Sequence, residues 1–340
     1  MLLKKNLNHY SPIINHVEDS MEKLHASAAA CLVIHRDKIV AEKYWGHASN
    51  ERNTSPIDED HQFYVASVRK SYIGFAVAYC VMKGYIQSID DPVTAYLTHL
   101  DSPLLDGVTI RHLLTHTHGL KMERNTIIKE FPPGCGWAYR GINIEWLTTI
   151  VKQVSGLSVK EIARKEAFDK LGFSHTDWHS QASKQLVPVL SEEGSPPYAL
   201  HSNKDGSQMN MYISLKELAY WGYLHLKKGK INGSQLVPAE LIELATTLHS
   251  PSTINKDDPQ NGFLWFVKET DAQRSEIGSS VPEGAFQILG YTGVTLLVIP
   301  SLEICAVRMF NRLGSTPDYD YLNDVRTFGD CVVSCAQTDR

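Results

Sequence analysis

Ser67 and Lys70 have the residue types and the spacing of a nucleophile with a neighbouring base. Residues three positions apart share one face of a helix, so the Lys nitrogen can lie beside the Ser oxygen. Residues 63–65 predict a strand that leads to Ser67. Residues 72–82 are almost all apolar and Gly84 follows them, which predicts a buried helix that ends at the glycine. A Lys at the start of a buried helix is partly desolvated, and desolvation lowers the pKa of an amine. The pair therefore predicts a serine activated for nucleophilic attack.

A simpler interpretation makes Ser67 a helix cap and Lys70 a solvated charge, and the spacing alone does not exclude it. The chain supplies a comparison, because Ser20 and Lys23 repeat the same spacing. That second copy lies in a polar helix, predicted over 17–24, with no buried run behind it. We interpret it as a coincidence, and the buried helix favours a catalytic role for Ser67.

Three histidines, His112, His116 and His118, crowd into the segment 108–120. Two histidines four apart on a helix can bind zinc. The Glu that accompanies such a pair in zinc proteases is absent, and no Asp follows the His-x-His. We therefore expect histidines that end a helix or face the core, and neither a metal nor another cofactor.

Tyr139 lies near the end of a loop rich in Pro and Gly, residues 131–141, which leads into an apolar helix predicted over 144–154. Loops of this kind present side chains to a cleft. Tyr139 could be a general base or a packed aromatic, and local sequence leaves both open.

The elements that must position these residues change in kind along the chain. A helix is predicted over 12–24 and two strands over 28–35 and 39–45; strands return over 263–268, 285–289, 294–299 and 303–311, and a last helix follows over 319–336. The fold class is then α+β, with one antiparallel sheet built from both terminal segments, flanked by helices, and an inserted, mostly helical lobe. We expect a sheet domain of residues 1–66 and 246–340, a helical domain of residues 67–245, and the active site in the cleft between them.

Composition narrows the class of function. The 340 residues, 43% hydrophobic and 21% charged, can bury a large core. A net charge of −5 without a basic block argues against nucleic acid and membranes as partners, and for small molecules or short peptides. The N-terminus lacks the apolar core of a signal peptide, and the six cysteines form no Cys-x-x-Cys pair, so we expect a cytoplasmic protein with reduced thiols. The sequence leaves the oligomeric state open.

Four segments together resemble one family. They are Ser-Val-Arg-Lys at 67–70, Asp-Asp-Pro-Val at 90–93, the run Thr-Ile-Arg-His-Leu-Leu-Thr-His-Thr-His-Gly-Leu at 109–120, and Pro-Gly at 133–134 before Tyr139. The chain resembles the serine hydrolases related to class C β-lactamases and penicillin-binding proteins. That family includes esterases, D,D-peptidases, D-amino-acid amidases and hydrolases of nylon oligomers. The resemblance implies a β-lactamase/transpeptidase-like fold, and it accounts for the histidines without a metal.

The resemblance also implies roles for the reacting groups. Ser67 would be the acylated nucleophile, Lys70 its proton-accepting neighbour, and Tyr139 the first residue of the family's Tyr-x-Asn motif, acting as base or proton relay. A nearby ammonium lowers the pKa of a phenol, so we expect Lys70 and Tyr139 to titrate together.

Two motifs depart from the family pattern. The Asn of Tyr-x-Asn falls on Gly141, so its amide is missing unless Asn143 reaches the site. The third motif, Lys-Thr-Gly or His-Thr-Gly in relatives, aligns with Ile288-Leu289-Gly290 or, in a shifted frame, with residues 291–293. In either frame the cation is replaced, by Ile288 or by Tyr291.

These departures bear on the substrate. In β-lactamases the cation helps to hold the substrate carboxylate, so we expect weaker turnover of β-lactams here. The backbone N–H groups of Ser67 and Tyr291, the latter directly after Gly290, can still form an oxyanion hole.

The leading hypothesis is a serine hydrolase that forms an acyl-enzyme on Ser67 and acts on an ester or a small amide. A catalytically silent, β-lactamase-like binding module is the alternative, motivated by Gly141 and the missing cation. A metallohydrolase that uses the three histidines is the weakest hypothesis.

Overall fold

The computed structural model of the chain describes residues 2–47, 56–98, 103–191 and 199–338. Its helices are α1 (Ser11–Lys23), α2 (Lys70–Met82), α3 (Ile110–Leu114), α4 (Ile142–Ser155), α5 (Val159–Ala163), α6 (Asp169–Leu171), α7 (Leu215–Leu226), α8 (Ala239–Thr246) and α9 (Tyr321–Gln337). Its strands are β1 (Leu3–Lys4), β2 (Ala28–His35), β3 (Lys38–Gly46), β4 (Gln62–Tyr64), β5 (Leu120–Glu123), β6 (Thr126–Lys129), β7 (Thr176–Trp178), β8 (Met211–Ser214), β9 (Lys230–Ile231), β10 (Ser234–Gln235), β11 (Gln260–Asn261), β12 (Phe266–Lys268), β13 (Ala285–Leu289), β14 (Thr295–Ile299) and β15 (Ile304–Phe310).

The main sheet contains strands from both ends of the sequence. Its order is β1-β3-β2-β15-β14-β13-β12-β11, so β2 lies directly beside β15. All neighbouring strands are antiparallel except β1, which runs parallel to β3. The predicted α+β class, with a sheet assembled from the two terminal segments, is confirmed.

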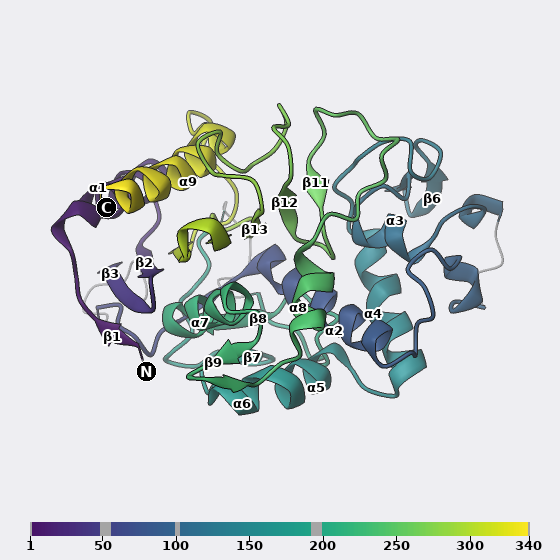
Figure 1. Cartoon of the computed structure of the whole chain (residues 1–340), viewed down its shortest axis with the longest axis horizontal. Coiled ribbons are helices and arrows are strands. Elements are labelled where there is room, and N and C mark those ends of the chain that lie inside the picture. Colours follow the sequence, from purple (N-terminus) through teal and green to yellow (C-terminus); the bar gives the residue numbers. More distant parts are fainter. Residues whose placement is uncertain (1, 48–55, 99–102, 192–198, 339–340) are drawn as a thin grey trace.

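Both faces of this sheet are covered. In β2, Ala29, Cys31 and Val33 pack with α1 and α9, whereas the alternate residues face the second core with α7. The period of two along the strand therefore divides one apolar strand between two cores. Helices α1 and α9, from opposite ends of the chain, lie next to one another (Figure 1).

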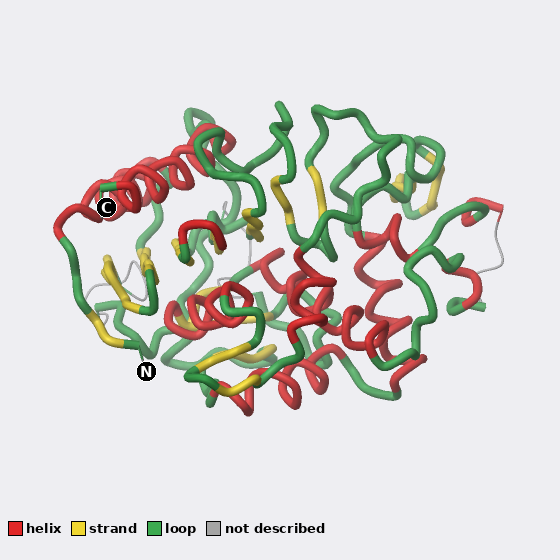
Figure 2. The backbone as a smooth tube through the Cα atoms, viewed as in Figure 1, coloured by secondary structure: helices red, strands yellow, loops and turns green. Residues whose placement is uncertain are grey.

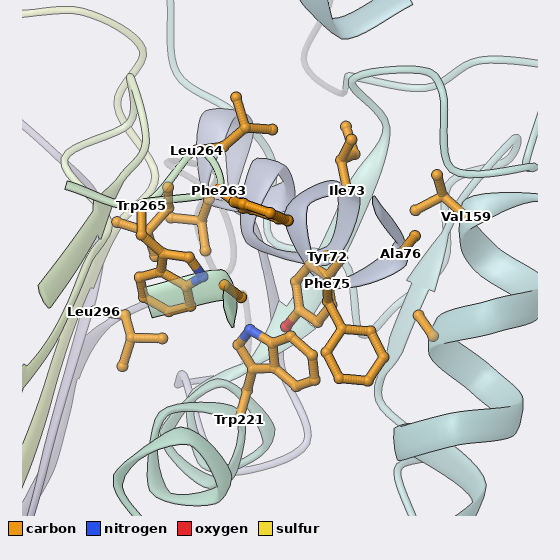
Figure 3. Close-up of a cluster of buried hydrophobic side chains, with 14 of the residues drawn as sticks. Tyr72, Ile73, Phe75, Ala76, Val159, Trp221, Phe263, Leu264, Trp265 and Leu296 are labelled. Atoms are coloured by element: carbon orange, nitrogen blue, oxygen red, sulfur yellow. The ribbon is translucent and has the colours of Figure 1, made fainter. Parts of the chain in front are cut away.

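Helix α2 lies in the centre of the second core. Its residues from Lys70 to Cys80 are all buried, as its apolar sequence predicts. The indole of Trp221 stacks on Tyr72 with ring centroids 4.4 Å apart and donates a hydrogen bond to the Ser71 hydroxyl at 3.0 Å (Figure 3). Gly74 lets the helix pass the backbone of Phe263, because a Cβ there would lie 2.1 Å from that carbonyl oxygen. The start of α2 is thus fixed from several sides.

Apart from the strand directly before Ser67, the middle of the chain contains β structure that the sequence patterns do not predict. Strands β4, β8 and β7 form a three-stranded antiparallel sheet, and β5 pairs with β6. Helix α7, although it comes before residue 245, packs against the main sheet. The division into two domains at residues 66 and 245 stays a prediction.

Loops make up most of the segment between α8 and β13, where only the short strands β11 and β12 interrupt them (Figure 2). This segment carries Phe266 and Glu276, both of which line a pocket that also contains Ser67. None of the helices in the described ranges is long and apolar enough to cross a membrane.

Candidate active site

Ser67 follows a sharp change in backbone direction. Strand β4 ends at Tyr64, and Ala66 then takes a φ of 45°, in the left-handed region that residues other than glycine seldom occupy. The chain passes directly into the 3₁₀ turn η2 (Ala66–Arg69) and then into α2. Ser67 is half-buried at the start of this helical segment. The predicted strand, Ser and buried helix therefore occur in that order.

Lys70 lies beside Ser67 in a buried environment. Its Nζ is 3.4 Å from the Ser67 Oγ, and the residue is 5% exposed. Burial, with a smaller contribution from the neighbouring Arg69 guanidinium, lowers the pKa of Lys70 to about 7. A large fraction of Lys70 is therefore neutral at neutral pH and able to accept a proton.

Tyr139 completes a group of three. Its hydroxyl shares a hydrogen bond with Ser67, and the Lys70 Nζ lies 3.7 Å from the centre of its ring. The ring packs between His116, at a centroid distance of 4.6 Å, and Phe266, at 6.2 Å. These ring contacts hold the phenol beside Ser67.

The pKa of Tyr139 differs from the expectation. The residue as a whole is 38% exposed, but its hydroxyl end lies against Ser67, and burial raises the pKa of the phenol to about 12. The predicted lowering by a Lys70 ammonium does not occur, because the cost of burying a phenolate outweighs it. Tyr139 is therefore protonated at neutral pH, while Lys70 is the group that changes charge there.

The turn after β13 packs against the segment that leads into Ser67. A Cβ on Gly290 would lie 2.4 Å from the carbonyl oxygen of Val65, so only glycine permits this approach. The Thr292 hydroxyl donates a hydrogen bond of 3.0 Å to the carbonyl of Tyr64. Between them, the N–H of Tyr291 donates to none of the acceptors in the described residues. The turn thus brings an unused N–H donor to the segment that carries Ser67.

We expect Gly290→Ala to lower kcat for ester hydrolysis by roughly 10²- to 10³-fold, the range found when an oxyanion donor is lost. The added methyl group collides with backbone rather than with a mobile side chain, so the turn must move away from Ser67. Steady-state kinetics with p-nitrophenyl butyrate measure the effect. Gly284→Ala is the control, because a Cβ there meets nothing within 4 Å; its positive φ, which Gly290 does not share, adds backbone strain without any collision. Equal kcat for the Gly290 variant and the wild type would contradict the proposed donor.

Two pockets adjoin these three residues. The first, which we call the aromatic pocket, has a volume of about 430 Å³ and contains Ser67; its other lining residues are Leu24, Trp137, Tyr139, Phe266, Glu276, Leu289, Gly290, Tyr291, Gly293, Gly314, Ser315, Tyr319 and Tyr321. The second, the polar pocket, has a volume of about 600 Å³ and is bordered by Arg69, Lys70 and Gly141. Both volumes are typical of small-molecule sites. Ser67 faces one pocket and Lys70 the other.

Two predicted binding residues lie elsewhere. The Asn143 amide is fully buried and donates a 2.7 Å hydrogen bond to the Leu113 carbonyl, so it does not replace the missing Asn. A Cβ at Gly141 would meet nothing within 4 Å, and that space stays open in the polar pocket. Ile288 is 1% exposed and packs in the core behind the sheet, whereas Leu289 lines the aromatic pocket. Their assignment to substrate binding is therefore corrected.

The three histidines have structural partners. His112 Nδ1 caps α3 by accepting from the Thr109 N–H at 3.1 Å, and His118 Nδ1 accepts from the Leu120 N–H at 3.1 Å. His116 is buried under Tyr139, and burial keeps its pKa well below the ordinary value. Within the described ranges, no three His, Cys, Asp or Glu side chains gather as a metal site would require. The second Ser-x-x-Lys copy is also structural, since the Ser20 hydroxyl donates to Asp324 at 2.5 Å.

Comparisons with known proteins identify the family to which this fold belongs. The β-lactamase family model matches residues 13–329. The chain belongs to the β-lactamase family. An uncharacterized protein from Alkalihalophilus pseudofirmus is 51% identical over 336 residues, which cover 98% of this chain and 99% of that protein.

Two further matches connect this β-lactamase-family chain to different members. Esterase EstB from Burkholderia gladioli is 38% identical over 96 residues, which cover 27% of this chain and 24% of the esterase. A penicillin-binding protein homologue from Caulobacter crescentus has the same fold, with a TM-score of 0.76 at 15% identity and coverage of 97% of this chain and 98% of that one. The family and the esterase relative support a hydrolase or an acyl-transferring enzyme.

The sequence patterns do not predict Glu276 as a site residue. Among the described residues that line the aromatic pocket, it is the one with a carboxyl group. It lies in a polar loop, and only the folded structure brings it near Tyr139 and Tyr321. The other missed residues include Trp137, which belongs to the loop already expected to present side chains to a cleft. The Pro- and Gly-rich loop was therefore the feature of the sequence that could have pointed to Trp137.

Proposed function

We propose that the protein is a serine hydrolase that forms an acyl-enzyme on Ser67. The observation that carries this proposal is the position of the Ser67 hydroxyl, which contacts both Lys70, at 3.4 Å, and Tyr139. One partner is a buried amine whose pKa is lowered to about 7, and the other is a protonated phenol. A hydroxyl between a proton acceptor and a proton donor has what acyl transfer requires.

The proposed reaction has two steps. Neutral Lys70 accepts the proton of Ser67 as Oγ attacks the substrate carbonyl, and the N–H groups of Ser67 and Tyr291 stabilise the negative oxygen. The Tyr139 hydroxyl donates its proton to the leaving group, and the Lys70 ammonium then passes a proton to the Tyr139 oxygen, so both groups are neutral again. Water attacks the acyl-enzyme and gives a proton to Lys70, and that proton passes to the Ser67 oxygen as the acid leaves.

The aromatic pocket favours an ester or a small amide over a β-lactam. Its described lining includes no Lys, Arg or His side chain, and it contains Glu276. A substrate carboxylate placed there would find no cationic partner and would be repelled once Glu276 is ionised. This agrees with the position of Ile288, which leaves the third motif without a charge facing the pocket.

Relative rates on two kinds of substrate test this proposal. We expect kcat/KM for p-nitrophenyl butyrate to exceed that for nitrocefin by about 100-fold or more, because a charge-assisted bond to the carboxylate, worth about 1.5–3 kcal/mol, is replaced by repulsion. Both substrates are chromogenic and can be measured with one enzyme preparation. A higher kcat/KM for nitrocefin would overturn the substrate assignment, and hydrolysis of neither would favour the silent binding module.

A further inference from the structure

Glu276 is a carboxyl group that the proposed acylation does not use. It lines the aromatic pocket with Ser67, and its Oε2 is buried with no hydrogen-bond partner among the described residues. Leaving a buried carboxylate oxygen unpaired costs free energy, so such a group calls for an explanation. One explanation is a ligand that binds in the pocket and supplies the missing hydrogen-bond or ion-pair partner.

The surroundings show what kind of partner is missing. The pocket presents six aromatic rings, from Trp137, Tyr139, Phe266, Tyr291, Tyr319 and Tyr321. Its described lining holds no cationic side chain. The positive charge of Arg326 lowers the pKa of Glu276 slightly, but its guanidinium donates hydrogen bonds to the Ser275 and Gln273 carbonyls and does not line the aromatic pocket. The carboxylate therefore has no ion-pair partner in the pocket itself.

We propose that the aromatic pocket binds a cationic group of the substrate, a protonated or quaternary amine, with Glu276 as its counter-charge and the rings around it. Aromatic faces attract ammonium groups, and the attraction grows when water is excluded. This inference rests on the proposed function for the position of the reacting carbonyl at Ser67. It narrows the substrate class to esters or small amides that carry an amine.

The charge of Glu276 makes this binding dependent on pH. Burial raises its pKa to about 7, so the carboxylate forms as the pH rises through that value. Of the groups near it, Tyr139 and Tyr321 have raised pKa values and stay neutral, and the Arg326 guanidinium opposes the rise in the pKa of Glu276 by a smaller amount. Lys70, whose Nζ lies 3.7 Å from the centre of the Tyr139 ring, loses its charge in the same range. Both changes favour a cation at higher pH, so a variant must separate them.

The test uses choline and its neutral isostere 3,3-dimethylbutan-1-ol, titrated by NMR at pH 8 into the Ser67→Ala protein and the wild type. We expect choline to bind about tenfold or more tightly than the alcohol. Glu276→Gln should remove most of that preference. Glu283→Gln, an exposed residue of the same loop region that does not line the pocket, should keep it. Equal binding of the two ligands, or a preference that survives in Glu276→Gln, would overturn the inference.

A second measurement covers a Glu276→Gln protein that fails to fold. Between pH 8 and pH 6 the ionised fraction of a group with a pKa of about 7 falls roughly tenfold. Choline affinity of the Lys70→Met protein, in which the charge of Lys70 no longer changes, should fall accordingly, and a constant affinity would contradict the role of Glu276. Because binding needs no turnover, a choline preference without ester hydrolysis refutes only the Ser67 chemistry. Hydrolysis without the preference refutes only this inference.

Discussion

Ser67→Ala should abolish hydrolysis of p-nitrophenyl butyrate, with kcat/KM lower by about 10⁴-fold or more, the scale seen when a nucleophile is removed. Ser67 is the residue whose hydroxyl contacts both Lys70 and Tyr139. Intact mass after treatment with a fluorophosphonate probe should show one added group on the wild type and none on the variant. The exchange removes only an oxygen at a half-buried position, so the fold should persist, which circular dichroism can check.

The second Ser-x-x-Lys copy supplies the matched control. Ser20→Ala removes a serine with the same sequence spacing to Lys23, but that hydroxyl bonds to Asp324 and to the His16 carbonyl. We expect a lower melting temperature for Ser20→Ala and unchanged labelling. Labelling of Ser67→Ala at the wild-type level would show that another residue is the nucleophile.

Lys70→Met and Tyr139→Phe should each lower kcat/KM by about 10²- to 10⁴-fold, the usual contribution of general acid–base assistance. The double variant should lose little more than either single one, because groups that act on one hydroxyl work as a unit. Steady-state kinetics of the three proteins measure both effects. Fully additive losses would mean that the two residues act in separate steps, and full activity in Tyr139→Phe would leave Lys70 to act alone.

The pH profile assigns the base. Lys70 accepts a proton only when neutral, so kcat/KM should rise as the pH increases through about 7, the pKa that burial gives this amine. The midpoint of this rise in kcat/KM should stay at the same pH in Tyr139→Phe. Burial and the Arg69 guanidinium lower the pKa of Lys70, and that variant leaves both in place. The rise should vanish in Lys70→Met and persist in Glu276→Gln. A midpoint that moves in Tyr139→Phe would restore the shared titration expected from the sequence.

The strongest predictions from sequence concern regular, strongly patterned elements. The hairpin of β2 and β3 forms where two strand-like segments joined by a short polar turn predict it, and Arg36 and Asp37 in that turn both take positive φ values. Strand β12 is shorter than predicted, because Leu264 takes a φ of 65° and breaks the extended run. Strands β4, β7 and β8 have three or four residues each, too few to show a period. Their pairing depends on contacts distant in sequence.

The candidate site divides along similar lines. The Ser67 and Lys70 spacing is local, so one helix places both residues, and the sequence was sufficient to propose them. The pKa of Tyr139 depends on how deeply tertiary packing buries its hydroxyl. Ile288 and Leu289 show how a single position along a strand decides which face receives a side chain. Glu276 gains its role only from surrounding rings on distant segments.

The pairing of β2 with β15 has a consequence for biosynthesis. Ala29 lies opposite Phe310, so the centre of the sheet joins segments from opposite ends of the sequence. At about 5–20 residues per second, a ribosome needs tens of seconds to make the chain between them. Over that time β2 and β3 can pair, but the other edge of β2 has no partner strand. Every residue of β2 is buried in the finished fold, so apolar surface stays exposed until β15 is made. The nascent protein should therefore depend on a chaperone more than its final compactness implies.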